Sequence, residues 1–259
     1  MNFDLKVIYR ISDKGNPKEK LLNADKFSCI KNAEENFGLE NIHIIADNCH
    51  FDTIDFLNNI GAKYEQTELG NIGSFLYVLD KVVKEYNPDS YVYFLEDDYL
   101  HRGGAKTILL EGLQIADYVT LYDHPDKYIN IKNNGNPFNY FNLQKSTLFV
   151  TKNSHWRTIN STTMTFAAKV KTIKEDLSIL KNQPRNGVPN DFGTFVTLTK
   201  QNNIIDFIML VMYRKKIAWN VMKNIFSFRK RRVLLSSIPG LATHAELKYL
   251  APTFNWEDI

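Results

Sequence analysis

The first hundred residues alternate between short apolar runs and stretches with helical spacing. Residues 5–11, 42–46 and 91–95 are runs typical of buried strands, and the last of them, YVYFL, is the strongest. Residues 18–37 and 70–83 lie between these runs and carry apolar side chains at helical spacing. This order predicts an α/β fold with a mostly parallel, Rossmann-like central sheet and flanking helices.

The later part of the chain is less regular. We expect strands over 62–66, 118–121 and 146–151, helices over 52–60, 108–116, 165–180 and 191–199, and a loop over 123–142. The length of 259 residues suits one α/β domain with an added segment. We therefore expect a catalytic domain over 1–202, a basic amphipathic helical insertion over 203–235, and a tail over 236–259 that completes the site.

Charge and cysteine content limit the partners and the compartment. The formal net charge is +3, so the chain as a whole is not expected to bind nucleic acid. Its two cysteines, Cys29 and Cys49, do not make a disulfide framework, which favours a cytoplasmic protein. The first ten residues are too charged for a signal peptide, and no apolar run reaches the length of a membrane span.

Three acidic residues, Glu96, Asp97 and Asp98, follow directly after the strongest predicted strand. Ligands bind at the carboxyl ends of strands in open α/β sheets, so the triplet is expected at a binding site. Adjacent carboxylates repel one another, and a divalent cation such as Mg²⁺ or Mn²⁺ would offset that cost while bridging to phosphates. Alternation along a strand would place Glu96 and Asp98 on one face. The alternative is a solvated acidic turn.

The segment YVYFLEDDYLH resembles the DxD-type motif of bacterial, GT2-like glycosyltransferases with the GT-A fold. The resemblance covers roughly residues 4–200 and 236–256. It implies that Glu96 contacts the donor ribose and that Asp98 binds the metal. Because the motif here is EDD, the division of donor contacts between Glu96 and Asp97 stays open.

Two further residues gain expected roles from this resemblance. GT-A enzymes often carry a late histidine that completes the metal site, which implies His244 as a ligand, with His101 as the competing candidate and a surface position as the alternative. Inverting members place an acid at the start of a helix in this part of the fold, which implies Asp191 as the general base. Helix capping by Asn190 or Asp191 is the alternative.

The donor pocket is expected at the ends of the first strands and at the start of a helix. The resemblance implies donor contacts for Arg10 and Asp47, although Asp47 next to Asn48 also suits a turn. Asn71 and Gly73 precede a helical pattern, where backbone N–H groups would face the donor.

A polar stretch over 155–165 is the expected acceptor site. Tryptophan packs on sugar rings and arginine pairs with phosphate, so we expect acceptor contacts from His155, Trp156, Arg157 and Thr162. The alternative is a polar loop with Thr165 capping the next helix.

Residues 203–232 mix apolar and aromatic residues with lysine and arginine. Such a segment can lie on the inner face of a membrane, where it would suit a lipid-linked or cell-envelope glycan acceptor. A core helix pair and an oligomer contact are the alternatives, and the sequence leaves the oligomeric state open.

Together these features predict a metal-dependent glycosyltransferase that moves a sugar from a nucleotide-sugar donor to a glycan or lipid-linked acceptor, with inversion. A nucleotidyltransferase is the first alternative, but residues 11–16 contain one glycine where those enzymes carry a glycine-rich loop. A non-catalytic relative that binds a glycan or partner through Trp156 and 203–232 is the second.

Overall fold

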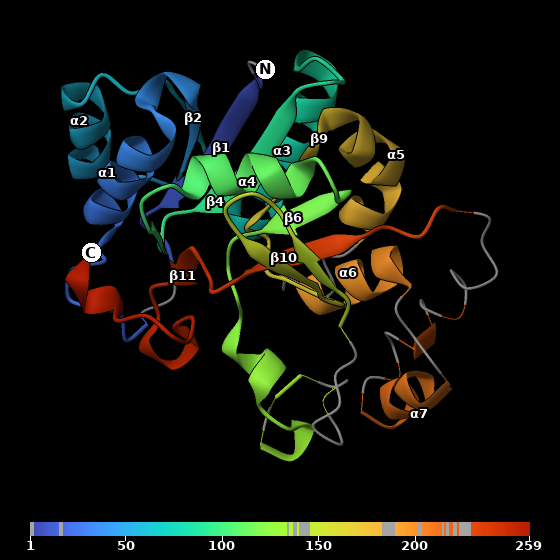
Figure 1. Cartoon of the computed structure of the whole chain (residues 1–259). Coiled ribbons are helices and arrows are strands. Elements are labelled where there is room, and N and C mark those ends of the chain that lie inside the picture. Colours follow the sequence, from blue (N-terminus) through green and yellow to red (C-terminus); the bar gives the residue numbers. More distant parts are fainter. Residues whose placement is uncertain are drawn as a thin grey trace.

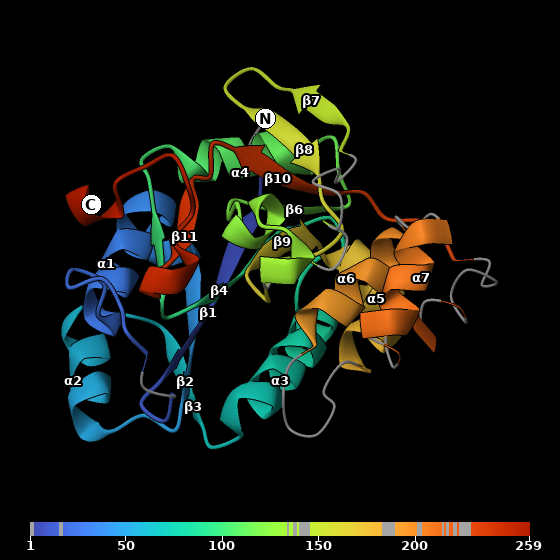
Figure 2. The same cartoon turned by 90° about the horizontal axis from the view of Figure 1, so that it is seen from below.

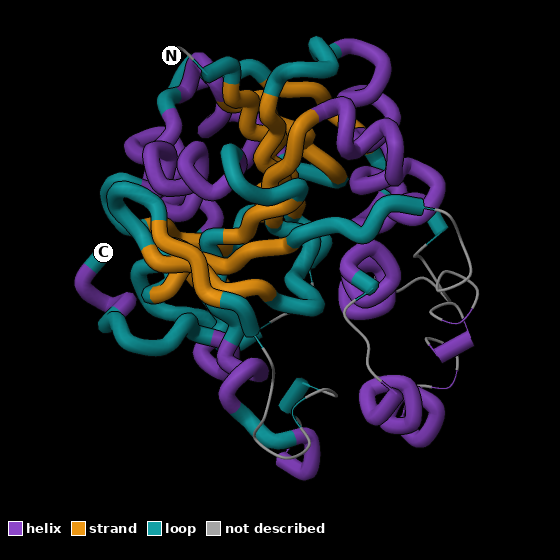
Figure 3. The backbone as a smooth tube through the Cα atoms, turned by 45° about the vertical axis from the view of Figure 1, so that its right-hand side comes forward, coloured by secondary structure: helices purple, strands orange, loops and turns teal. Residues whose placement is uncertain are grey.

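The computed structural model describes residues 3–15, 18–133, 135–136, 139, 146–182, 190–200, 204–213, 215, 218–219, 222 and 229–259. Within this part, the chain forms a nine-stranded sheet with helices on both faces (Figure 1). Figure 3 shows these strands running through the middle of the molecule between the helices. The predicted α/β fold is therefore confirmed.

The first hundred residues form one side of the sheet, in which β1 to β4 run parallel to one another. β1 (Leu5–Ser12) lies between β2 (Ile42–Asp47) and β4 (Tyr91–Glu96), and β3 (Tyr64–Thr67) pairs with β2. β1, β2 and β4 follow the predicted runs closely, because apolar side chains on both faces of a strand require burial on both sides.

The rest of the chain extends the same sheet beyond β4. In order, the added strands are β9 (Phe166–Lys169), β6 (Tyr118–Thr120), β10 (Leu234–Ile238), β8 (His155–Thr158) and β7 (Leu148–Val150). Only β9 and β8 run against the other strands of this sheet in the described part of the chain. The sheet is therefore mostly parallel, as predicted.

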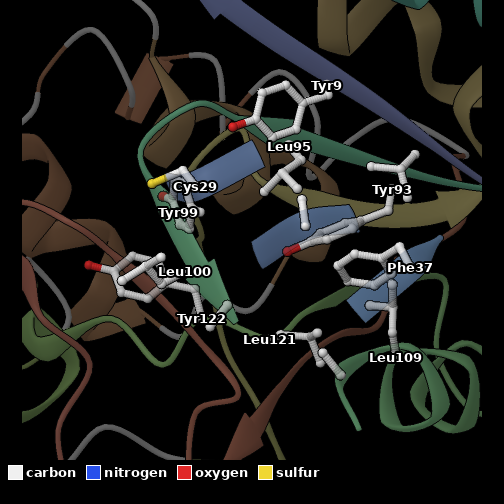
Figure 4. Packing of buried hydrophobic residues seen from close by; sticks show 14 of the residues in the cluster. Tyr9, Cys29, Phe37, Tyr93, Leu95, Tyr99, Leu100, Leu109, Leu121 and Tyr122 are labelled. Atoms are coloured by element: carbon white, nitrogen blue, oxygen red, sulfur yellow. The ribbon is translucent and has the colours of Figure 1, made fainter. Parts of the chain in front are cut away.

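Helices cover the two faces of the sheet in two groups (Figure 2). One face carries α1 (Lys26–Phe37), α2 (Phe51–Asn59) and α4 (Ala105–Leu113). The other carries α3 (Gly70–Glu85), α5 (Val170–Lys181) and α6 (Asp191–Thr199). Figure 4 shows the first core, where Tyr93 of β4 packs against Phe37 of α1 and Tyr9 of β1 belongs to the same cluster. Short 3₁₀ helices lie at Leu39–Asn41, Pro125–Tyr128, Ile131–Asn133, Leu247–Tyr249 and Trp256–Asp258.

Two predicted helices are shorter than expected. The helix predicted over 18–37 begins only at Lys26, because Asp25 caps it by accepting a hydrogen bond from the N–H of Ser28. The helix predicted over 165–180 begins at Val170, and the residues before it form β9, which fills the space between β4 and β6. In the second case, pairing with neighbours on both sides outweighs local helical spacing.

The C-terminal tail returns to the acidic motif. β11 (Ala242–His244) pairs with β5 (Tyr99–His101) in a separate two-stranded sheet, with His244 opposite Tyr99. The N–H of Ala245 also donates to the carbonyl of Asp98 at 2.7 Å. This pairing places His244 beside the end of the triplet.

The basic amphipathic segment 203–232 lies partly outside the described residues. Its described helix, α7 (Ile204–Tyr213), packs Phe207 against Val196 of α6. Met212 is 63% exposed and Trp219 is 55% exposed. No described helix combines the length and the apolar character that crossing a lipid bilayer requires.

Candidate active site

The acidic triplet lies where β4 ends and the chain turns. Glu96 is the last residue of β4, Asp97 and Asp98 form a turn, and β5 follows at once. Strand alternation therefore stops at Glu96. As a result, Glu96 and Asp98 contact different neighbouring residues. The expectation from strand alternation, that both carboxylates point to one site, is wrong. Neither is splayed into solvent, since their side chains are 27% and 12% exposed.

Glu96 is paired with Arg10 of the neighbouring strand. The guanidinium Nη2 donates to Glu96 Oε1 at 2.6 Å. The other terminal nitrogen, Nη1, donates to the carbonyl and side-chain oxygens of Asn71 at 2.7 and 3.0 Å, and to Ser74 Oγ at 3.1 Å. Three of the residues predicted to bind the donor, Arg10, Asn71 and Glu96, thus form one connected cluster between the sheet and the start of α3.

Asp97 is directed at the end of β1. Its Oδ2 accepts a hydrogen bond from the N–H of Ser12 at 2.9 Å. Burial raises the pKa of this carboxyl, and the neighbouring charge of Asp98 raises it further. The contact with Ser12 links the turn to β1, and the predicted donor contact of Asp97 stays a prediction.

Asp98 and His244 face each other across the pairing of β5 and β11. His244 Nε2 lies 3.2 Å from Asp98 Oδ2. Lys18 Nζ lies 3.2 Å from the same oxygen. Burial alone would raise the pKa of Asp98, but the hydrogen bond from His244 and the nearby positive charges outweigh it and hold this pKa low. Asp98 is therefore ionised, and its carboxylate lies beside the ammonium of Lys18.

The ring of His244 is held in place on two sides. The N–H of Glu246 donates to Nδ1 at 3.1 Å, so Nε2 is the nitrogen that faces Asp98. The ring packs edge-on against Tyr99, with 5.2 Å between the ring centroids. By contrast, the competing candidate His101 is buried beside Tyr93, whose hydroxyl lies 2.9 Å from its Nε2, and burial lowers its pKa to about 3. The geometry therefore places His244, and not His101, beside Asp98.

The pair suits a divalent cation. A carboxylate oxygen and an imidazole nitrogen are competent ligands for Mn²⁺, and Mg²⁺ is commonly bound through one or two carboxylates plus substrate phosphates. A lysine ammonium already lies against these atoms, which shows that the position attracts positive charge. Among the described residues, no group of three histidine, cysteine or acidic side chains could hold a metal. The remaining ligands would therefore come from substrate or water.

Asp191 is the first residue of α6, but it does not cap the helix. Asn190 is the cap, since its Oδ1 accepts from the N–H of Gly193 at 3.2 Å. The missing side chain of Gly193 leaves room for this contact, because a Cβ there would lie 2.4 Å from the Asn190 amide. Asp191 Oδ1 is buried and has no hydrogen-bond partner within the described residues. Burial, together with the charge of Glu96, raises the pKa of Asp191 to about 7.

Both carboxylate oxygens of Asp47 accept hydrogen bonds from neighbouring residues. Its Oδ1 accepts from Thr67 Oγ1 at 2.8 Å and from the N–H of Leu69 at 2.6 Å, and its Oδ2 accepts from Asn48 at 2.9 Å. These contacts join β2 to the turn that leads into α3, and they match the turn-forming alternative. A contact with the donor stays a prediction.

Gly73 lies in the first turn of α3, close to Leu69. A Cβ at Gly73 would lie 2.8 Å from the Leu69 side chain, so the close approach requires glycine. Its expected donor contact, like that of Asp47, is untested by the geometry.

The predicted acceptor residues do not form one surface. His155–Thr158 is a strand, so neighbouring side chains point to opposite faces. Trp156 is fully buried against Gly112 of α4, and its ring is enclosed by protein rather than open to a sugar. Arg157, on the other face, donates to Asp123 at 2.6 Å and stacks over Tyr128, with 4.5 Å from the guanidinium carbon to the ring centroid.

Thr162 lies in the loop after β8 and is buried. Its Oγ1 has no partner within the described residues, and neither has Arg157 Nε. The neighbouring Thr163 meets Tyr99, which follows the acidic triplet, at 2.9 Å between hydroxyl oxygens. This loop therefore reaches the candidate site, whereas His155 lies at the exposed start of β8.

Sequence patterns missed one contributor to the site. Lys18 contacts Asp98. It belongs to no motif and is brought in by pairing between distant segments.

Comparisons with known protein families and with curated protein sequences find no match. Solved structures do show similarity. One is a cytidylyltransferase from Leptospira borgpetersenii, at 10% identity over 85% of this chain and 97% of that chain, with a TM-score of 0.40. Another is S. aureus TarS 1–349, at 12% identity over 86% and 72%, with a TM-score of 0.41. A third is glucosyl-3-phosphoglycerate synthase from Mycobacterium tuberculosis in complex with Mg²⁺ and uridine diphosphate, at 10% identity over 80% and 66%, with a TM-score of 0.38.

Proposed function

We propose that this chain is a metal-dependent glycosyltransferase that moves a sugar from a nucleotide-sugar donor to a glycan or lipid-linked acceptor, with inversion. The observation that carries the proposal is the meeting of Asp98 and His244, which are far apart in the chain and lie 3.2 Å apart in space. They form an anionic, nitrogen-containing pair at the end of a central strand, where ligands of open α/β sheets bind.

Asp98 and His244 would hold Mn²⁺ or Mg²⁺. When bound, the ion neutralises the charge that develops on a departing diphosphate. The cluster of Arg10, Asn71 and Glu96 lies beside the same strand end, where Glu96 can accept hydrogen bonds from a ribose hydroxyl and Arg10 keeps its carboxylate oriented.

Asp191 is the proposed general base. A carboxylate with a pKa of about 7 can take the proton of the acceptor hydroxyl as that oxygen attacks the anomeric carbon of the sugar. The bond from the anomeric carbon to the diphosphate breaks in the same step, and the nucleoside diphosphate leaves with the electron pair. The pKa of Asp191 is set by burial and by Glu96, so the base lies close to the proposed donor cluster.

The acceptor is proposed to contact Arg157 and Thr162 from the loop side. Both carry buried polar atoms without partners within the described residues, and an acceptor hydroxyl could satisfy them. In this proposal Trp156 supports the strand from the opposite face, and His155 marks the exposed rim.

A thermal-shift screen of nucleoside diphosphates, with and without Mn²⁺, tests the donor half of the proposal. Ligand-linked stabilisation should require both one base type and the metal. A matching nucleotide-sugar should then be hydrolysed slowly or transferred. Stabilisation by a nucleoside triphosphate with release of pyrophosphate would instead favour a nucleotidyltransferase, and no response to any nucleotide would favour a non-catalytic relative.

We also propose that segment 203–232 contacts an anionic membrane surface. Ile208 and Trp219 expose 51% and 55% of their area, and Lys215 and Arg231 are exposed near them in the chain. Co-sedimentation with phosphatidylserine vesicles, but not with phosphatidylcholine vesicles, is expected. Loss of co-sedimentation in Trp219→Ser would support the contact, and equal pelleting with neutral vesicles or none with either would contradict it.

A further inference from the structure

Lys18 places a positive charge at the position proposed for the metal. Its Nζ lies 3.2 Å from Asp98 Oδ2, 3.4 Å from His244 Nε2 and 3.8 Å from Glu246 Oε2. Its side chain is 35% exposed, so Lys18 is only partly enclosed by the protein. The ammonium thus lies beside both proposed metal ligands.

The backbone fixes this arrangement. Lys20 pairs with Glu246 in an isolated antiparallel bridge, and the N–H of Leu21 donates to the carbonyl of Ala245 at 3.0 Å. The same tail segment is bound to the acidic turn through β11 and β5. Lys18, Asp98 and His244 therefore come from three segments held together by main-chain hydrogen bonds, and only the lysine side chain is long and flexible.

Two cations cannot share these ligands. Mg²⁺ requires oxygen ligands at about 2.0–2.1 Å, and an ammonium about 3 Å from the same oxygen would repel it and occupy part of its coordination shell. A metal at Nε2 of His244 would also require the ring proton to lie on Nδ1, which would end the hydrogen bond that Nδ1 accepts from Glu246. The arrangement described here is therefore complete with lysine as its cation.

We propose that Lys18 is an exchangeable cation of the active site. It pairs with Asp98, beside His244, while the donor is absent, and it moves to the diphosphate when a divalent cation takes its place. The second half of this statement depends on the proposed function, whereas competition between Lys18 and the metal does not. The consequence is that diphosphate and metal bind cooperatively, because diphosphate draws away the group that blocks the metal.

The first test is a Mn²⁺ titration of the full chain, followed by the electron paramagnetic resonance signal of free Mn²⁺. Lys18→Met is expected to bind Mn²⁺ at least about tenfold more tightly than the natural chain, since the competing charge is gone. Lys18→Arg keeps the charge and should stay within about threefold of the natural chain. Adding Asp98→Asn to Lys18→Met should abolish the gain. Equal or weaker Mn²⁺ binding in Lys18→Met, with an unchanged melting temperature, would overturn the proposal.

The second test measures coupling with inorganic pyrophosphate as the probe. Pyrophosphate should strengthen Mn²⁺ binding by a larger factor in the natural chain than in Lys18→Met, after correction for complex formation in solution. Equal factors would show that Lys18 does not move to the diphosphate. Neither test needs a donor sugar or turnover. If no transferase reaction is found, both binding tests can still be interpreted. If the competition test fails, the transferase proposal is unaffected.

Discussion

Arg10 and Glu96 lie opposite each other in the register of the parallel strands β1 and β4, and Arg10 Nη2 donates a hydrogen bond to Glu96 Oε1 at 2.6 Å. The side chain of Arg10 is 9% exposed. The pair therefore joins β1, β4 and α3 at the point where the acidic triplet begins.

Breaking this pair should destabilise the fold. Arg10→Met leaves Glu96 with an unpaired, half-buried charge and frees the oxygens of Asn71, so we expect a loss of about 1–3 kcal/mol in the free energy of unfolding. Urea denaturation measures it. Lys6→Met is the matched control, because Lys6 lies on the same strand in an exposed pair with Asp4 and should cost less than about 1 kcal/mol. Equal losses in the two variants would contradict a special role for Arg10.

Asp191→Asn should spare donor binding and stop transfer. In the natural chain, kcat/KM should rise with pH with an apparent pKa of about 7, because the carboxylate must be ionised to accept a proton. The measurement is kcat/KM between pH 5.5 and 8.5, together with donor affinity from thermal shifts. If Asp191→Asn retains turnover with the same pH dependence of kcat/KM, Asp191 is not the general base.

The same substitution should change stability in a pH-dependent way. A carboxyl whose pKa is raised on folding stabilises the fold only while it is protonated, and this contribution is lost as pH rises from about 4 through about 7. Asp191→Asn should therefore match the natural chain at pH 4 and exceed it at pH 8 by on the order of 4 kcal/mol. A stability difference that does not vary with pH would show that burial does not raise the pKa of the Asp191 carboxyl.

Asp98→Ala should abolish metal-linked stabilisation by the nucleoside diphosphate. In the natural chain, ligand at about 100 times its Kd adds about 2.7 kcal/mol, which corresponds to roughly 5–10 °C in the melting temperature of a chain this size. The variant should show no shift on adding Mn²⁺ with the nucleotide. Asp89→Ala, at an 85% exposed carboxylate, is the control and should behave like the natural chain. A full Mn²⁺-dependent shift in Asp98→Ala would place the metal elsewhere.

Gly112→Ala should test the packing role of Trp156. A Cβ at Gly112 would lie 2.7 Å from the buried indole ring, and such overpacking costs about 1–3 kcal/mol, offset by about 1 kcal/mol of helix propensity. We expect a net loss in thermal stability and a shift in tryptophan fluorescence. Gly103→Ala, where a Cβ meets nothing within 4 Å, should be close to neutral.

Much of the fold was predictable because β1, β2 and β4 are buried on both faces and read as unbroken apolar runs. The place of the acidic triplet at the end of β4 and the start of α6 at Asp191 were predictable for a related reason, since each follows a clear boundary signal. β9 was not, because its four residues FAAK continue the helical spacing of α5 and become a strand only between β4 and β6.

The acids of the candidate site and Arg10 were expected from the sequence, whereas Lys18 was not. The contacts of Lys18 depend on the pairing of segment 18–21 with the tail, which no local pattern encodes. Trp156 and Arg157 were expected to act together, but a strand separates neighbouring side chains onto opposite faces.

The pairing of β5 with β11 also bears on how the protein is made. Asp98 emerges from the ribosome early, whereas His244 emerges only after all nine strands of the main sheet have been synthesised. If Asp98 and His244 hold the proposed metal, a nascent chain could not bind it through both residues before β11 has been synthesised.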